Sequence, residues 1–537
     1  MRMTNKIMQN NTLYNINNNK ILQDKLSTQM ATQKKLTRPS DDPVIAIRAL
    51  RLRTSVSELT QFSEKNAKDA EAWLTVTEDA LSTVNDVITK MIEQGNKGAN
   101  KDLEGEQLSI IMEQLKSLRD ETYATANVDY AGRYIFTGFR TDTTLSFNDE
   151  VESKDLEYSI TEQVGINSFD SINYTDQAGV EGLNKGNYAG FTGADNTPNE
   201  TIEEQDVNNG DIHRLRLSYD DLMDGTVPTL TYMDNAGAEV SLTAASTPVS
   251  STASPDPYQT IMTMNGAGVS GSVYVPETGE ILFSDAAYNA IVGTVTTGTE
   301  IRVTYSKDEW KEGDLRPEHY FACTSEEIMP DGTSKTIHYN QNLDASGAPR
   351  VPKEPINPNG QKIEYDVGYN QTIVINTSAA DVFTHAMDRN MDDLDRAVIE
   401  LRAIETTVND MKGVLGTLSA GTADYELVRK QLDAATKAGD HIRENVHRMF
   451  EGVVTKMQNA LDDINVAVTD SGTRSARLDM IGNRLLSQKT TFETLKSENE
   501  DASISDVAIK LTSTELSYNA ALMASGKIMQ TSLINYI

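Results

Sequence analysis

The sequence predicts a multidomain α + β protein. Long helices at both chain ends are expected to form an antiparallel coiled coil or helical bundle, with one or two all-β outer domains inserted between them. Three observations support this fold class. Twelve of the 14 prolines lie between Pro198 and Pro358, where they interrupt helices. Apolar residues repeat at helical spacing on both sides of this segment, and β-forming runs lie inside it. A chain of 537 residues is long enough for three or four domains.

A sustained heptad pattern marks the N-terminal helical part. Its positions alternate in steps of three and four and are mostly apolar, with polar interruptions at Ser63, Asn66 and Thr77. The pattern runs through Leu52, Val56, Leu59, Ser63, Asn66, Ala70, Trp73, Thr77, Ala80, Val84, Val87 and Met91. A second helix follows, with an apolar face from Leu108 to Thr122. Because each stripe is one-sided, each helix needs a partner to cover it.

Helical stripes return after the proline-rich segment. They run from Phe383 to Leu401, from Val428 to Leu495 and from Ile504 to Met529. We expect the N- and C-terminal helical sets to pack on each other, since each set presents an apolar stripe. Residues 43–147 and 377–499 are therefore predicted to form a helical coiled-coil domain.

The middle of the chain, residues 148–376, is predicted to form one or two β-rich outer domains. Runs of β-formers lie at 214–219, 229–233, 272–275, 280–284 and 300–305, with turn-forming residues between them. The stretch at 219–225 is similar to a calcium loop, but Leu222 occupies a ligand position, so we expect a hairpin turn there.

The two chain ends, residues 1–42 and 500–537, are predicted to be terminal helices that are buried between molecules. Seven of the fifteen residues from Asn5 to Asn19 are asparagine, a poor helix former, so this segment needs a covering surface. The last helix carries two apolar lines, and one N-terminal helix can cover only one of them. The expected assembly residues are Ile7, Tyr14, Ile21, Ile504, Leu511, Leu516, Tyr518, Leu522, Met523 and Met529.

Charge and composition exclude several classes of function. The formal net charge is −32, which argues against a nucleic-acid binder or an anionic-membrane binder. The basic N-terminal stretch is therefore expected to contact a protein partner or the export gate. The single cysteine, Cys323, excludes an intrachain disulfide and a cysteine-based zinc site. No run of 18 apolar residues occurs, so we expect no membrane span.

The sequence gives no sign of catalytic, cofactor or metal chemistry. His441 and His447 are six residues apart on a predicted helix and face different sides, whereas metal-binding pairs sit three or four apart. Cys323 has no motif around it. We expect neither an enzyme nor a bound cofactor or metal.

Several motifs carry a resemblance to a known family. The first, RPSDDPV, includes Arg38, Pro39, Ser40, Asp41, Asp42 and Pro43, and predicts a turn with Asp42 as helix N-cap and Pro43 as first helical residue. The second, GRYIFTGFRT, includes Gly132, Arg133, Tyr134, Ile135, Phe136 and Gly138. Together with SAADVFTHAM at 378–387 and the ending SLINYI at 532–537, they resemble the flagellar hook-associated protein 3 family, a branch of the flagellin superfamily. The resemblance covers roughly residues 1–148 and 378–537.

This resemblance implies a secreted, non-enzymatic structural adaptor at the hook–filament junction of the bacterial flagellum, exported by the type III route. The partners that it implies are hook-associated protein 1, flagellin, copies of the chain itself in a junction ring, the filament cap protein transiently, and an export chaperone. It implies no nucleic acid and no membrane.

Two other functions remain open at this stage. The chain could be a flagellin that forms the filament itself. Flagellins commonly carry an arginine-rich run on the second N-terminal helix, and the corresponding stretch here, 87–100, contains no arginine, which favours the junction protein. The second alternative is an enzyme or adhesin whose active part is the β region.

Overall fold

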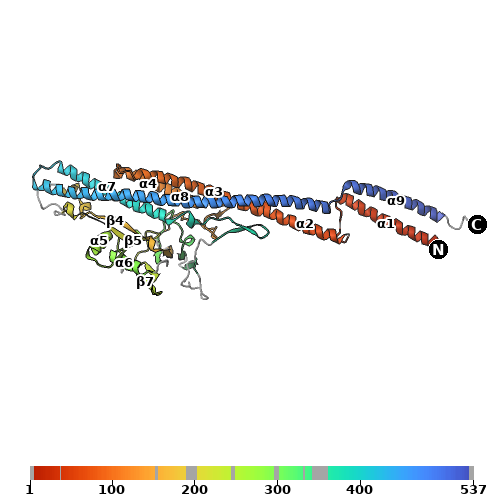
Figure 1. Cartoon of the computed structure of the whole chain (residues 1–537), viewed down its shortest axis with the longest axis horizontal. Helices are drawn as coiled ribbons and strands as arrows, with labels where there is room; N and C mark the ends of the chain where they lie inside the picture. The colour runs from red at the N-terminus through yellow and green to blue at the C-terminus, as the bar shows by residue number, and fades with distance from the viewer. Residues whose placement is uncertain are drawn as a thin grey trace, which may run out of the picture. The chain divides into compact units, whose positions relative to one another are not determined.

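The computed structural model describes residues 5–36, 38–40, 42–151, 155–188, 202–243, 248–295, 301–329, 333–341 and 361–530. Long helices near both chain ends, with β-sheets inserted between them, confirm the predicted fold class (Figure 1). The chain forms two compact units. Met1–Ala72, Glu364–Ile373 and Ser475–Ile537 make up the first unit, and Trp73–Ile363 with Val374–Arg474 make up the second. No described helix combines the length and apolarity needed to cross a membrane.

Seven α-helices of the described chain lie outside the inserted β-rich region. The N-terminal helices are α1 (Asn5–Thr32), α2 (Pro43–Gln61), α3 (Ala67–Gly98) and α4 (Gly105–Ala126). On the C-terminal side, α7 (His385–Leu415) is followed by α8 (Ala423–Glu500) and α9 (Ile504–Gln530). Of these seven helices, only α4 and α7 lie wholly in the second unit, while α3 and α8 are shared between the units.

The predicted heptad is buried along α3. Trp73, Val84 and Met91 are each at most 1% exposed. On the facing helix α8, Phe450 approaches Gly98 so closely that a Cβ there would lie 2.3 Å from the phenyl ring. The small residue on α3 therefore lets the two backbones approach, and α4 packs against α7 in the same unit.

A π-helical turn, Phe62–Asn66, separates α2 from α3 and contains both Ser63 and Asn66, two of the polar interruptions of the heptad. The hairpin of β13 (Glu364–Gly368) and β14 (Gln371–Val374) contacts this turn. Asn66 Nδ2 donates to the carbonyl of Asp366 at 2.7 Å, and the Phe62 ring meets Tyr369 edge to face. The polar break in the heptad therefore lies where the β13–β14 hairpin packs. The sequence analysis did not predict this contact.

The inserted region contains two larger antiparallel sheets. The four-stranded sheet has the order β4 (Phe169–Asp176), β5 (Asn208–Arg216), β9 (Glu280–Phe283) and β8 (Ser272–Val275). The six-stranded sheet has the order β12 (Ser334–Tyr339), β11 (Ala322–Ile328), β3 (Leu156–Val164), β10 (Ile301–Lys307), β6 (Thr229–Met233) and β7 (Glu239–Thr243). Both sheets contribute to one aromatic-rich core around Trp310 and Tyr158.

Smaller elements complete the chain. A short pair, β1 (Asp129–Tyr130) and β2 (Arg133–Tyr134), follows α4. Short 3₁₀ turns lie at Ile166–Ser168, Val180–Gly182, Lys185–Tyr188, Glu204–Asp206, Pro317–His319 and Ala379–Asp381.

The structure corrects the sequence analysis at two places in the inserted region. Two helices, α5 (Pro257–Ala267) and α6 (Asp285–Thr294), lie where only strands were predicted. Asp256 caps α5 and Pro257 is its first residue, a helix-start signal that the surrounding prolines hid. The expected hairpin turn at 219–225 is instead a loop between the two sheets, because β5 and β6 pair with other strands.

Candidate assembly site

The terminal helices α1 and α9 pack on each other within the first unit. Leu26 of α1 and Val507 of α9 are buried, and Leu511 and Tyr518 are half-buried. One polar contact lies alongside them, where Gln23 Nε2 donates to Glu515 Oε1 at 3.4 Å. The pair therefore covers one face of each helix.

A second apolar line on each terminal helix is exposed in the single chain. On α9, Ile509, Leu516 and Met523 follow a seven-residue step and are 68%, 72% and 73% exposed. On α1, Ile7, Tyr14 and Ile21 follow the same step and are exposed as well. Large apolar side chains repeated along one line of a helix are typical of a surface that another helix covers.

The other expected assembly residues divide between these two surfaces. Ile504 and Leu522 are exposed, whereas Leu511 and Tyr518 lie partly in the contact with α1. The side chain of Met529 and residues 531–537, which include SLINYI, lie outside the described residues. The structure thus brings Leu511 and Tyr518 into the helix pair and leaves Leu516 and Met523 open.

A charged joint ties the turn after α1 to the turn after α8. Glu500, the last residue of α8, has a nearly buried carboxylate that accepts two hydrogen bonds from Arg53, at 2.6 and 2.8 Å. The backbone also closes the joint, since Lys35 N donates to Glu500 O at 2.7 Å and Ala502 N donates to Gln33 O at 2.9 Å. The hydrogen bonds from Arg53 lower the pKa of Glu500, so this carboxylate stays charged and paired at neutral pH.

The first family motif lies at this joint. Asp42 caps α2 by accepting from Val44 N at 3.0 Å and Ile45 N at 3.2 Å, and Pro43 is the first helical residue, as predicted. Arg38 and Pro39 line a hollow of about 160 Å³ together with Glu500. Ser40 is exposed in the turn, and Asp41 lies outside the described residues.

The second family motif is a packing element of the second unit. Its turn uses Gly132, with φ at +77°, and Gly138, with φ at +63°, both in the region that favours glycine. The guanidinium of Arg133 lies 4.9 Å from the centre of the Trp73 ring. Phe136 is buried and meets Phe383 edge to face, with ring centres 5.0 Å apart. Ile135 is also buried, and Tyr134 is half-buried in the β-pair.

This contact joins two of the motifs that carried the family resemblance. Phe383 belongs to SAADVFTHAM, and the backbone of that stretch is bound as well, because Ala379 N donates to Phe136 O at 3.2 Å. Phe136 and Phe383 are 247 residues apart in the sequence. Their packing against each other gives a structural reason for finding both in one chain.

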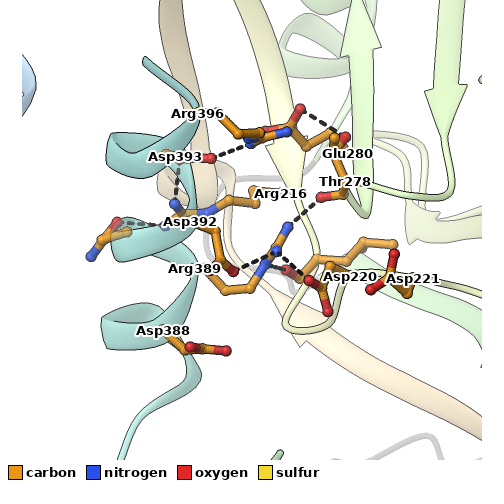
Figure 2. Close-up of polar contacts among 12 residues, drawn as sticks. Arg216, Asp220, Asp221, Thr278, Glu280, Asp388, Arg389, Asp392, Asp393 and Arg396 are labelled. Carbon is orange, nitrogen blue, oxygen red and sulfur yellow. Dashed lines mark hydrogen bonds and ion pairs between the residues drawn. The ribbon is translucent and has the colours of Figure 1, made fainter. Parts of the chain in front are cut away.

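A buried polar network, which the sequence analysis missed, attaches the four-stranded sheet to α7 (Figure 2). Asp393 of α7 accepts from Arg214 at 2.7 Å and from Arg216 at 2.6 Å, and Arg396 contacts both Asp393 and Glu280. Arg389 reaches the carbonyl of Thr278. Although burial alone would raise the pKa of Asp393, Arg214, Arg216 and Arg396 hold it well below its usual range.

Neither a metal-binding cluster nor a reactive cysteine is found in the part of the chain that the structure describes. No group of three or more histidine, cysteine, aspartate or glutamate side chains in the described ranges is placed to hold a metal ion. Cys323 is buried in the core of the β region, where burial raises its pKa well above the usual value. A thiol in that environment is a poor nucleophile.

The N-terminal part of the chain matches a known family. Residues 3–141 match the family model of the bacterial flagellin N-terminal helical region, about a quarter of the chain. This range contains α1–α4 and both N-terminal motifs. The N-terminal part of this chain is therefore similar to the N-terminal helical region of bacterial flagellins.

Two curated relatives of this chain carry the same name, flagellar hook-associated protein 3. The chain is 29% identical over 143 residues to flagellar hook-associated protein 3 of Salmonella typhimurium and 28% identical over 144 residues to that of Escherichia coli. The matched segments cover 26% and 27% of this chain, and the chain spans about half the length of each relative, 45%. These matches confirm the resemblance to the hook-associated protein 3 family.

Solved structures with related titles also align. The alignment with FlgL of Xanthomonas campestris covers 83% of this chain and 99% of that chain, with 13% identity and a TM-score of 0.28. The alignment with the flagellar junction protein FlgL of Legionella pneumophila covers 81% and 99%, with 10% identity and a TM-score of 0.26. These TM-scores are too low to establish a common spatial arrangement of the whole chains.

Proposed function

We propose that this protein is a structural adaptor of the bacterial flagellum. It joins the hook, through hook-associated protein 1, to the flagellin filament, and polymerises through its terminal helices. The observation that carries this proposal is the second apolar line on each terminal helix. Ile509, Leu516 and Met523 on α9 remain exposed although α1 already covers the other face of that helix. A surface of this kind is stabilised when a neighbouring subunit covers it.

The proposal includes the position and the partners of the protein. It is secreted, located at the hook–filament junction and free of enzymatic activity. Its neighbours are hook-associated protein 1, flagellin and copies of itself in a ring, with transient contacts to the filament cap protein and an export chaperone. The names of the two curated relatives support the flagellar role.

We assign three domains to these tasks. The terminal helices of residues 1–42 and 500–537 make the assembly contacts, the helices of 43–147 and 377–499 form the supporting bundle, and residues 148–376 form the outer part. The joint at Glu500 supports the first division, because it ties residues 33–35 and 500–502 together where α1 ends and α9 begins.

Flagellin is the alternative, since the matched N-terminal region is shared with that class. Antibody labelling of intact flagella distinguishes the two functions. A junction protein gives a single band of label between hook and filament and a trace band in sheared flagella. Label along the whole filament, with this chain as the dominant band, would establish flagellin instead.

A further inference from the structure

Three hollows follow one another along α8 in the second unit. The first, about 300 Å³, lies between β4 and α8 and includes Arg448 and Lys456. The second, about 410 Å³, also includes Lys456 and extends to Asp463, and the third, about 430 Å³, also includes Asp463 and extends to Arg474. Because neighbouring hollows share lining residues, they form one trough. It follows α8 for about 40 Å at the rise of an α-helix.

Positive charge is under-compensated where the first and second hollows meet. Arg214 contacts three carboxylates, those of Asp170, Glu280 and Asp393. Among the described carboxylates, Arg216 forms an ion pair only with Asp393, which it shares with Arg214. Its second hydrogen bond goes to the neutral Asn390 Oδ1, at 2.8 Å. Lys456 Nζ donates to Asn390 Oδ1 at 2.9 Å, and no carboxylate of the described chain lies within ion-pair distance of it. Burial, together with Arg216, lowers the pKa of Lys456.

Negative charge is under-compensated where the second and third hollows meet. Asp381 and Asp463 line both hollows, and neither forms an ion pair with any described lysine, arginine or histidine. Burial and the neighbouring carboxylate of Asp463 raise the pKa of Asp381. Arg474 opposes this rise but forms its ion pair with Asp470, so no cation among the described residues forms an ion pair with Asp381.

Apolar side chains line the trough between these two ends. The second hollow includes Met387, Met391, Val453 and Met457. Methionine side chains are flexible and polarisable, so they adapt to apolar groups of different shape. The second hollow thus has a cationic end, an apolar floor and an anionic end.

We propose that this trough binds an extended polypeptide segment of a partner protein. An acidic side chain of the segment pairs with Lys456 and Arg216, apolar side chains cover the methionine floor, and a basic side chain pairs with Asp381 or Asp463. This site goes beyond the proposed assembly function, because none of its residues belongs to the terminal helices. A polypeptide fits better than a small molecule because the trough continues past both charged ends into the outer hollows.

The structure also sets the spacing within the segment. Lys456 and Asp463 are seven residues apart on α8, which corresponds to about 10 Å along the helix axis. An extended segment in the polyproline II conformation advances about 3.1 Å per residue with three residues per turn, so side chains three positions apart project to the same side. The acidic and basic residues of the partner are therefore three positions apart, with two apolar residues between them.

Labelled peptides test this pattern on the full-length monomer. The core Asp-Leu-Leu-Lys, flanked by glycine and serine and carrying a fluorophore, is titrated by fluorescence anisotropy. Three control peptides carry Lys-Leu-Leu-Lys, Asp-Leu-Leu-Asp and Ser-Leu-Leu-Ser. We expect the acidic–basic peptide to bind about tenfold more tightly than each control, which corresponds to about 1.4 kcal/mol. Equal binding of all four peptides would overturn the proposal.

Charge exchange in the protein provides the second measurement. Lys456→Glu should weaken binding of the acidic–basic peptide about tenfold and strengthen binding of the Lys-Leu-Leu-Lys peptide. The exposed Lys412→Glu on α7 makes the same charge change away from the trough and should alter neither affinity. Thermal unfolding checks that both variants fold. If Lys456→Glu leaves both affinities unchanged, or if 8-aminooctanoate binds as tightly as the acidic–basic peptide, the trough is not a polypeptide site.

Discussion

Replacing Leu516 by aspartate tests whether this residue of α9 stabilises the assembly rather than the fold of the monomer. The Leu516 side chain is 72% exposed in the single chain, so it contributes little to packing there. Aspartate has a lower helix propensity than leucine, by about 0.5 kcal/mol. We therefore expect Leu516→Asp to change the free energy of unfolding of the monomer by less than about 1 kcal/mol.

The same substitution should have a much larger effect once a neighbouring subunit covers this line. Burying a leucine side chain contributes about 1.5–3 kcal/mol, and burying an unpaired carboxylate costs several kcal/mol more. A loss of about 4 kcal/mol per contact weakens association about a thousandfold. Filaments should then detach from the hook.

The assay combines two measurements on one variant. Circular dichroism and thermal unfolding report on the purified monomer, and filament protein shed into the medium reports on the junction in a strain that carries only the variant chain. Val507→Asp is the matched control, since Val507 on the same helix is buried in the monomer. It should accelerate amide hydrogen exchange in α1 and α9 of the monomer.

Two outcomes would refute the reasoning on Leu516. If Leu516→Asp lowers monomer stability as much as Val507→Asp, its line belongs to the internal core. If the variant monomer is intact and filaments stay attached, the line is not an assembly surface.

Three further predictions concern the second unit. Phe136→Ala should lower the free energy of unfolding by about 3–5 kcal/mol in a urea titration, because it leaves a cavity beside Phe383. Phe139 is exposed, so Phe139→Ala should change this free energy by less than about 0.5 kcal/mol in the same titration. Burial raises the pKa of Glu400 to about 7, so its contribution to stability is present below its usual pKa near 4.5 and is lost as the pH rises through 7. Glu400→Gln should therefore raise the unfolding free energy by about 2 kcal/mol at pH 8 and leave it unchanged at pH 4, and equal effects at both pH values would contradict this assignment. Asp393→Asn removes the carboxylate that Arg214 and Arg216 share, and should lower the free energy of unfolding by about 3–5 kcal/mol. Asp395→Asn removes a partly exposed ion pair with Lys116, and should lower it by at most about 1 kcal/mol in the same chemical unfolding measurement.

Sequence patterns predicted the regular elements well where one periodicity persists. The heptad from Ala70 to Met91 is buried as expected, and the runs at 229–233 and 272–275 coincide with β6 and β8. The prediction was incomplete where signals compete. Helix α5 begins inside a proline-rich stretch, and its N-cap at Asp256 was outweighed by the prolines around it.

The candidate site was predictable only in part. Helical spacing identified two apolar lines on the last helix, but it could not decide which line α1 covers. The structure shows Leu511 and Tyr518 toward α1 and leaves Leu516 and Met523 exposed. The choice depends on how the two helices are rotated against each other, and local sequence does not encode that rotation.

The sequence by itself determined the helical ends, the β-rich insertion and the family motifs, because helix and strand preferences and turn chemistry act over a few neighbouring residues. Only the tertiary structure decided which charges meet. Asp170, Arg214, Glu280 and Asp393 belong to one buried network although up to 223 residues separate them. The same holds for the trough along α8, whose charged ends become visible only when β4 and α7 lie beside that helix. Ion pairing acts over a few ångströms in space, whatever the separation along the chain.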